Sequence, residues 1–186
     1  MELISNKDLR YFKTGVAHLD DYLLANELFW NLPGLSMLTL GGLYLAEVHL
    51  QTTPLNDDER KIFTSTLQKM ELISLKWRVA WEKKIRWEIT SRLNLWQNYL
   101  ADYWSAPEDH GEYYVREVRW RVMLQLLSDN LSGNYKERNI LRVLDDRLRK
   151  SFIPGVFIWS SELSELLDDQ SFWFLYGTLL VGVLRK

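Results

Sequence analysis

The sequence predicts an all-α fold, a bundle of about five to seven helices around one long central helix that is either continuous or kinked. The first observation is the absence of glycine and proline between Pro54 and Pro107, where apolar residues recur mostly every three or four positions. The second is a set of three capping-box sequences, in which a short polar residue precedes a glutamate by three positions. These are Asn56-Asp57-Asp58-Glu59, Asp109-His110-Gly111-Glu112 and Asn134-Tyr135-Lys136-Glu137.

The first capping box opens the long helix. Its predicted apolar face consists of Phe63, Leu67, Met70, Trp77, Trp81, Ile85, Ile89, Leu93, Trp96, Leu100 and Tyr103. A continuous helix over residues 57–104 is about 70 Å long at the usual rise per residue. A compact domain of this size is only about 40 Å across. We therefore expect either a break, at Thr90-Ser91, or an elongated molecule, and we favour an elongated bundle with a bend.

The other two boxes open shorter helices. The second predicts a helix over residues 112–128 with two apolar faces, as in a helix packed between neighbours. Arg119 projects near one of these faces, and a buried arginine needs a carboxylate partner. The third box predicts a helix over residues 135–150. Its inward residues are Leu141, Leu144 and Leu148.

The N-terminal third predicts two helices separated by a turn at Pro33-Gly34. The first has an apolar face that runs from Phe12 to Trp30. The second covers residues 35–51, and Gly41-Gly42 within it permits close contact with another helix.

The C-terminal part is less regular. A turn at residues 153–155 precedes a short extended piece over residues 156–159. Ser160 or Ser161 is placed to cap a short helix that ends at Leu167. The last segment, residues 172–184, fits either a helix or a strand.

Composition indicates one globular domain over residues 1–186. Hydrophobic residues make up 47% and charged residues 26% of the chain, and a chain of this length buries roughly 70% of its unfolded surface. The absence of cysteine excludes disulfides and thiolate chemistry and fits a reducing compartment, so a cytoplasmic location is the default expectation. Residues 28–46 and 171–184 are uncharged, but glycine and proline interrupt the first and the second is shorter than the ~20 residues of a membrane span. We therefore expect buried helices rather than membrane insertion.

No catalytic, cofactor-binding or metal site is predicted. The histidines are His18, His49 and His110, and none belongs to a nucleophile or metalloprotease motif. The Glu-x-x-His pairs of metal-binding bundles are missing, and Gly41-Gly42 matches neither phosphate-loop pattern. A carboxylate-rich site at His18, Asp20 and Asp21 is a minor alternative.

One surface of the long helix is a candidate interaction site. It consists of Lys69, Lys76, Lys83, Arg86 and Trp87. The lysines are seven residues apart and fall on one line, which a solvated helix face also explains. Trp87 projects opposite the apolar face, and burial against another helix is the structural alternative. As a functional residue, Trp87 can anchor a protein partner or stack on a base while the basic side chains follow a phosphate backbone.

The sequence therefore predicts an interaction or assembly protein without catalytic activity, bound to a protein partner or to itself. The first alternative is a nucleic-acid-binding accessory protein, because residues 59–150 carry 18 basic and 13 acidic side chains. Pairing of this region with the acidic ends of the chain within one molecule is the simpler expectation. The second alternative is an enzyme or small-ligand binder with a cavity lined by aromatic residues, since the chain has nine tryptophans, most of which we expect in the core.

Overall fold

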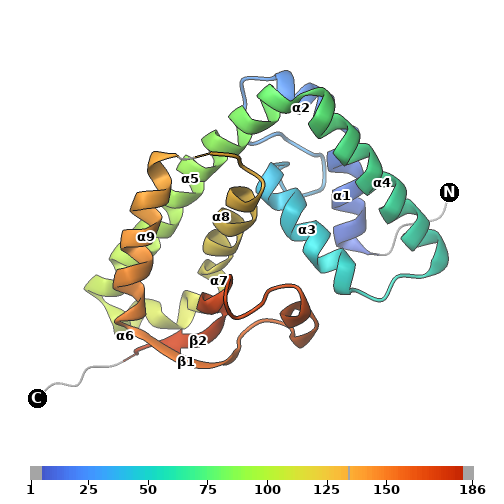
Figure 1. Cartoon of the computed structure of the whole chain (residues 1–186). Coiled ribbons are helices and arrows are strands. Elements are labelled where there is room, and N and C mark those ends of the chain that lie inside the picture. The colour runs from blue at the N-terminus through green and yellow to red at the C-terminus, as the bar shows by residue number, and fades with distance from the viewer. Residues whose placement is uncertain (1–5, 134, 182–186) are drawn as a thin grey trace, which may run out of the picture. The chain divides into compact units, whose positions relative to one another are not determined.

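The computed structural model describes residues 6–133 and 135–181 and confirms the all-α prediction, including a long helix, α5 (Arg78–Ser105) (Figure 1). We predicted a single domain. The structure contains two compact units, residues 1–88 and 89–186, which are described in turn. The first part of α5 belongs to the first unit, and the rest of this helix belongs to the second.

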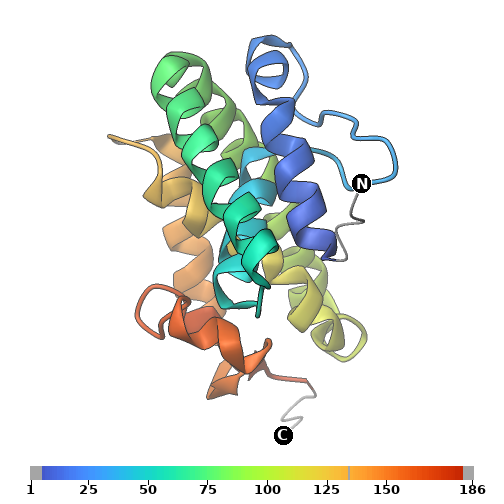
Figure 2. The ribbon, with the colours of Figure 1, turned by 90° about the vertical axis from the view of Figure 1, so that its right-hand side faces the viewer.

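The first unit is helical throughout its regular structure. It contains α1 (Lys7–Ala17), α2 (Leu19–Leu24), α3 (Leu40–Thr52), α4 (Asp57–Lys76) and the start of α5. Helix α1 lies beside both α3 and α4 (Figure 2). Gly42 of α3 lies close to α1, because a Cβ atom at this position would meet the hydroxyl of Tyr11 and displace that side chain. The prediction that these glycines permit close helix packing is therefore confirmed for Gly42.

The N-terminal helices are shorter than predicted. The first predicted helix is divided at His18 and ends at Leu24 instead of continuing to Trp30. The second begins only at Leu40. Thr39 fixes this start, because its hydroxyl accepts a hydrogen bond of 3.0 Å from a backbone N–H in the first turn.

The break in the long helix lies at Trp77, and the prediction of a break at Thr90-Ser91 is wrong. Helix α4 ends at Lys76, and the backbone of Trp77 has φ −112° and ψ 32°. The chain turns a corner there before α5 begins (Figure 1). Thr90 and Ser91 lie inside α5.

One of the three capping boxes forms as predicted. Asn56 and Glu59 make both reciprocal side-chain bonds at the start of α4. The second prediction is wrong, because Asp109 lies within α6 (Pro107–His110), and proline is favoured at the first helical position. The third box includes Asn134, which lies outside the described residues.

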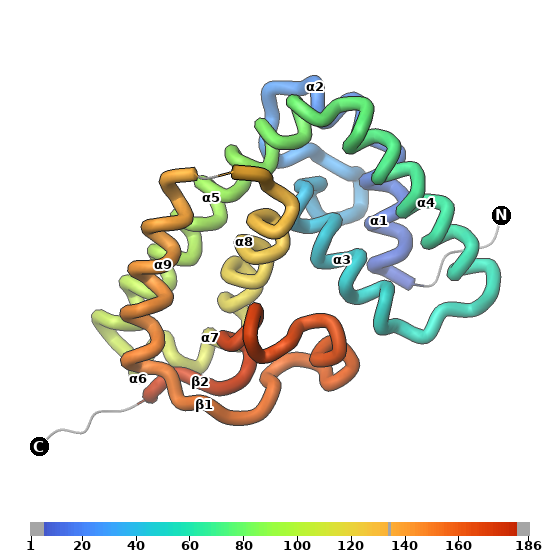
Figure 3. The backbone as a smooth tube through the Cα atoms, in the orientation of Figure 1, coloured from blue at the N-terminus to red at the C-terminus, as the bar shows by residue number. Residues whose placement is uncertain are grey.

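The second unit surrounds the remainder of α5. Its elements after α6 are the 3₁₀ helix η1 (Gly111–Tyr113), α7 (Tyr114–Glu117), α8 (Arg119–Asp129), α9 (Lys136–Arg149), β1 (Phe152–Phe157), the 3₁₀ helices η2 (Ser161–Glu165) and η3 (Trp173–Leu175), and β2 (Tyr176–Leu179). Helices α8 and α9 lie beside α5, with β1 and β2 near one end of them (Figure 3). The inward leucines predicted for α9 are buried.

The C-terminal part forms a small antiparallel sheet that the sequence did not predict. The expected turn at residues 153–155 belongs to β1, which pairs with β2. Residues 172–184 contain η3 and β2, and residues 182–184 lie outside the described part. The expected short helix is the 3₁₀ helix η2, without a side-chain cap from Ser160 or Ser161.

The buried arginine of α8 is Arg121 and not Arg119. Arg119 is exposed and stacks on Trp120, with its guanidinium carbon 4.2 Å from the ring centroid. Arg121 is buried and donates two hydrogen bonds, of 3.0 and 2.8 Å, to the carboxylate of Asp145 on α9. The predicted need for a carboxylate is therefore met at a different residue, and the bidentate pair joins α8 to α9.

Removal of this carboxylate leaves a buried charge without its partner. We expect Asp145→Ala to lower the free energy of unfolding by about 3–5 kcal/mol, measured by urea denaturation. Asp146→Ala is the matched control, since Asp146 is the next residue of α9 and is exposed. Equal effects of the two substitutions would show that the pair contributes little to stability.

Candidate functional site

The structure brings three of the five candidate residues together in the first unit. Lys76, Lys83 and Trp87 line one groove. Lys69 and Arg86 are exposed but lie outside its lining. The predicted line of lysines is interrupted because it crosses the break at Trp77.

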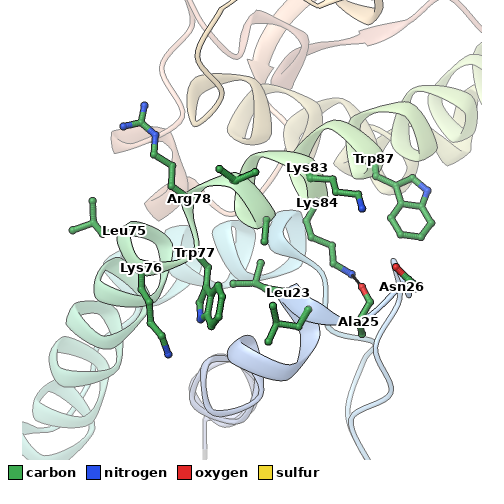
Figure 4. A pocket seen from close by; sticks show the side chains of 13 residues that line it. Leu23, Ala25, Asn26, Leu75, Lys76, Trp77, Arg78, Lys83, Lys84 and Trp87 are labelled. Atoms are coloured by element: carbon green, nitrogen blue, oxygen red, sulfur yellow. Dashed lines mark hydrogen bonds between the residues drawn. The ribbon is translucent and has the colours of Figure 1, made fainter.

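The groove has a volume of about 470 Å³ and lies where α2, the end of α4 and the start of α5 meet (Figure 4). Its apolar lining includes Leu23, Leu24, Leu75, Trp77, Val79 and Trp87. Leu75 is 72% exposed, Val79 is 85% exposed and Trp87 is 44% exposed. Leu75 and Trp87 lie at opposite ends of the groove (Figure 4). Large apolar side chains left exposed around a groove are typical of interaction sites rather than of chance exposure.

Asp20 holds the corner that forms this groove. Its Oδ1 atom accepts hydrogen bonds from Nζ of Lys76, at 2.8 Å, and from Nε1 of Trp77, at 2.6 Å. The bond from Lys76, followed by that from Trp77, lowers the pKa of the Asp20 carboxyl below its usual 3.8. The carboxylate thus attaches the last residue of α4 and the break residue to the first turn of α2.

Lys84 fixes the opposite wall. It is 3% exposed, and its ammonium donates to the carbonyl oxygens of Ala25, at 2.9 Å, and of Glu27. Nζ also lies 4.3 Å from the ring centroid of Tyr22 and 5.5 Å from that of Trp87. Burial lowers the pKa of Lys84. Because carbonyls and rings surround the ammonium, Lys84 anchors the segment after α2 instead of presenting an amine to the groove.

The charged side chains at the groove are mostly paired within the unit. Lys76 is bound to Asp20, and the guanidinium of Arg78 lies 3.3 Å from a carboxylate oxygen of Glu82. Lys83 is exposed and has no ion-pair partner among the described residues. The groove therefore presents apolar side chains beside one available cation.

Sequence reasoning missed most of the apolar lining. Leu72 and Leu75 of α4 and Val79 of α5 are all exposed, and Leu75 and Val79 line the groove. Helical spacing connects only the two leucines, because the break at Trp77 separates them from Val79. No pattern in the sequence connects Leu24 to these residues, because Leu24 comes from another helix. Among the tryptophans, only Trp81 and Trp96 are fully buried, so the expectation that most lie in the core is wrong.

In residues 6–133 and 135–181, no three histidine, aspartate or glutamate side chains are arranged so that they could hold a metal ion. Asp20, part of the minor alternative with His18 and Asp21, is bound to Lys76 and Trp77 instead. Within the same residues, no helix has the length and apolar character needed to cross a membrane. Comparisons with known proteins found no matching family, no matching curated protein and no matching solved structure.

The Asp20 clamp predicts a pH-dependent stability. A carboxyl whose pKa is lowered in the folded state stabilises the protein above its unfolded pKa, and this stabilisation is lost as the pH falls through the folded value. We expect Asp20→Asn to lower the melting temperature at neutral pH and to change it much less once the pH is below the folded pKa of Asp20, which is lower than 3.8. Asp21→Asn, on the same helix, is the control. A difference that persists unchanged in acid would contradict the ionic role of Asp20.

Proposed function

We propose that this chain is a protein-interaction module whose groove between α2, α4 and α5 binds an acidic, amphipathic segment of a partner protein. The observation that carries the proposal is the exposure of Leu75, Val79 and Trp87 around a groove in which Lys83 is the available charge.

The apolar part of the groove supports a protein partner. Trp87 keeps nearly half of its surface exposed, and Lys84 packs against one face of the indole. A tryptophan held in this way loses little side-chain freedom on binding, and residues of this type dominate the binding energy of interfaces. Leu75 and Val79 extend the apolar surface around the corner of α4 and α5.

The charge at the groove supports an acidic partner. Lys83 stands beside Trp87 and is available for a carboxylate, while the other cations already have partners in the unit. A charge at the edge of an apolar site favours partners of opposite charge and speeds their association. An amphipathic segment with apolar anchors three or four residues apart and carboxylates beside them has both required properties.

The alternatives from the sequence fit the groove less well. A phosphate backbone needs several available cations along a line, but Lys76 and Arg78 are paired and the line is broken at Trp77. A small-ligand site needs polar groups that point into a cavity, and the ammonium of Lys84 is already bound to backbone carbonyls. A cytoplasmic location stays a prediction based on the absence of cysteine.

Peptide selection tests the proposal without knowledge of the partner. A displayed library of random peptides of about 15 residues, enough for four helical turns, is selected on the immobilised full chain. We expect enriched peptides with apolar residues at helical spacing and with Asp or Glu between them. Leu75→Asp and Trp87→Ala should each weaken the best peptide by at least about tenfold, the range expected for anchor residues.

Val143→Asp is the matched control, because Val143 is an exposed apolar residue of α9 in the second unit. It should leave peptide binding unchanged. Enrichment of basic peptides, or equal binding by the groove variants and the native chain, would refute the proposed docking site.

A further inference from the structure

The second unit contains an exposed segment that is both acidic and apolar. This acidic segment, residues 160–170, includes η2 and the residues that follow it. Between residues 151 and 181 the chain carries four acidic and no basic side chains, and all four lie in this segment. They are Glu162, Glu165, Asp168 and Asp169, and each is exposed.

The segment is held in place by its own leucines. Leu163 and Leu167 are buried, whereas Leu166 is 40% exposed. The hydroxyl of Tyr176 donates to the carbonyl oxygen of Leu167 at 2.9 Å, which ties the segment to β2. The segment therefore presents one apolar side chain, Leu166, from a fixed backbone with carboxylates on both sides.

These carboxylates have no cationic partner. None of the four forms an ion pair with a described lysine, arginine or histidine. Glu162 accepts a hydrogen bond from Ser160, and Asp168 accepts from the backbone N–H groups of Gln170 and Ser171. Glu165 and Asp169 have no such partner among the described residues, and of these two Glu165 is next to Leu166.

We infer that the groove of the first unit binds the acidic segment of a second copy of this chain, with Leu166 at the apolar side chains and Glu165 at Lys83. The inference rests on the proposed function of the groove. Charge complementarity supports it, since an unpaired lysine beside exposed apolar residues meets unpaired carboxylates beside an exposed leucine. In a two-fold dimer, each copy supplies one groove and one acidic segment, so the groove–segment contact forms twice.

A charge exchange tests this pairing in the full chain. We expect the native protein to dimerise with a concentration dependence measured by native mass spectrometry and light scattering. Lys83→Glu and Glu165→Lys each place like charges in both contacts of their own dimer and should weaken it by about tenfold or more. A mixture of the two variants has one native and one exchanged contact, so it should form a heterodimer more tightly than either variant forms a homodimer.

Glu112→Lys is the control, since Glu112 is an exposed acid of the second unit outside the acidic segment, and it should dimerise like the native chain. A native protein that stays monomeric over the whole concentration range would overturn the inference. So would a dimer whose affinity neither substitution changes, or a mixture of the variants that forms no excess of heterodimer. Peptide selection separates the two proposals. Acidic peptides that bind the groove of a monomeric chain would leave the docking site standing and remove only the second copy as its occupant.

Discussion

The carboxylate of Asp20 receives hydrogen bonds from both Lys76 and Trp77, and the geometry of the groove depends on this interaction. The stretch between Pro54 and Pro107 could form one long helix. The local sequence does not explain why the helix breaks at Trp77, because there is no glycine or proline there. The break coincides with a contact from α2. At Trp77 the backbone leaves the helical region, the indole N–H donates to Asp20, and α5 begins at the next residue.

Lys84, on α5, binds the segment that follows α2. Its buried ammonium satisfies carbonyl oxygens that follow the end of α2, where a helix leaves its last acceptors unpaired. Asp20 and Lys84 therefore both bind groups within the first unit, so neither charge is available to a partner. Leu75 and Val79, next to the corner at Trp77, remain exposed.

The features that could be predicted from the sequence are local ones. The capping box of Asn56 and Glu59 needs only four residues, and the buried leucines of α9 need only helical spacing. The break at Trp77 could not be predicted, because the contact made there joins Trp77 to Asp20, 57 positions earlier in the chain. Lys76, Lys83 and Trp87 line one groove although the break separates Lys76 from the other two, whereas Lys69 of α4 and Arg86 of α5 lie outside its lining.

The ion pairs show which of the acidic regions of the chain are paired with basic side chains. Pairing of the acidic ends with the basic middle is realised at the N-terminal side, where Asp20 binds Lys76. It is not realised for the acidic segment of the second unit, whose four carboxylates have no cation within ion-pair distance in the described chain. Solvated carboxylates alone need no partner, but these surround an exposed leucine on a fixed backbone. In the proposed dimer, the exposed leucine and its unpaired acids would meet the exposed groove and its unpaired lysine.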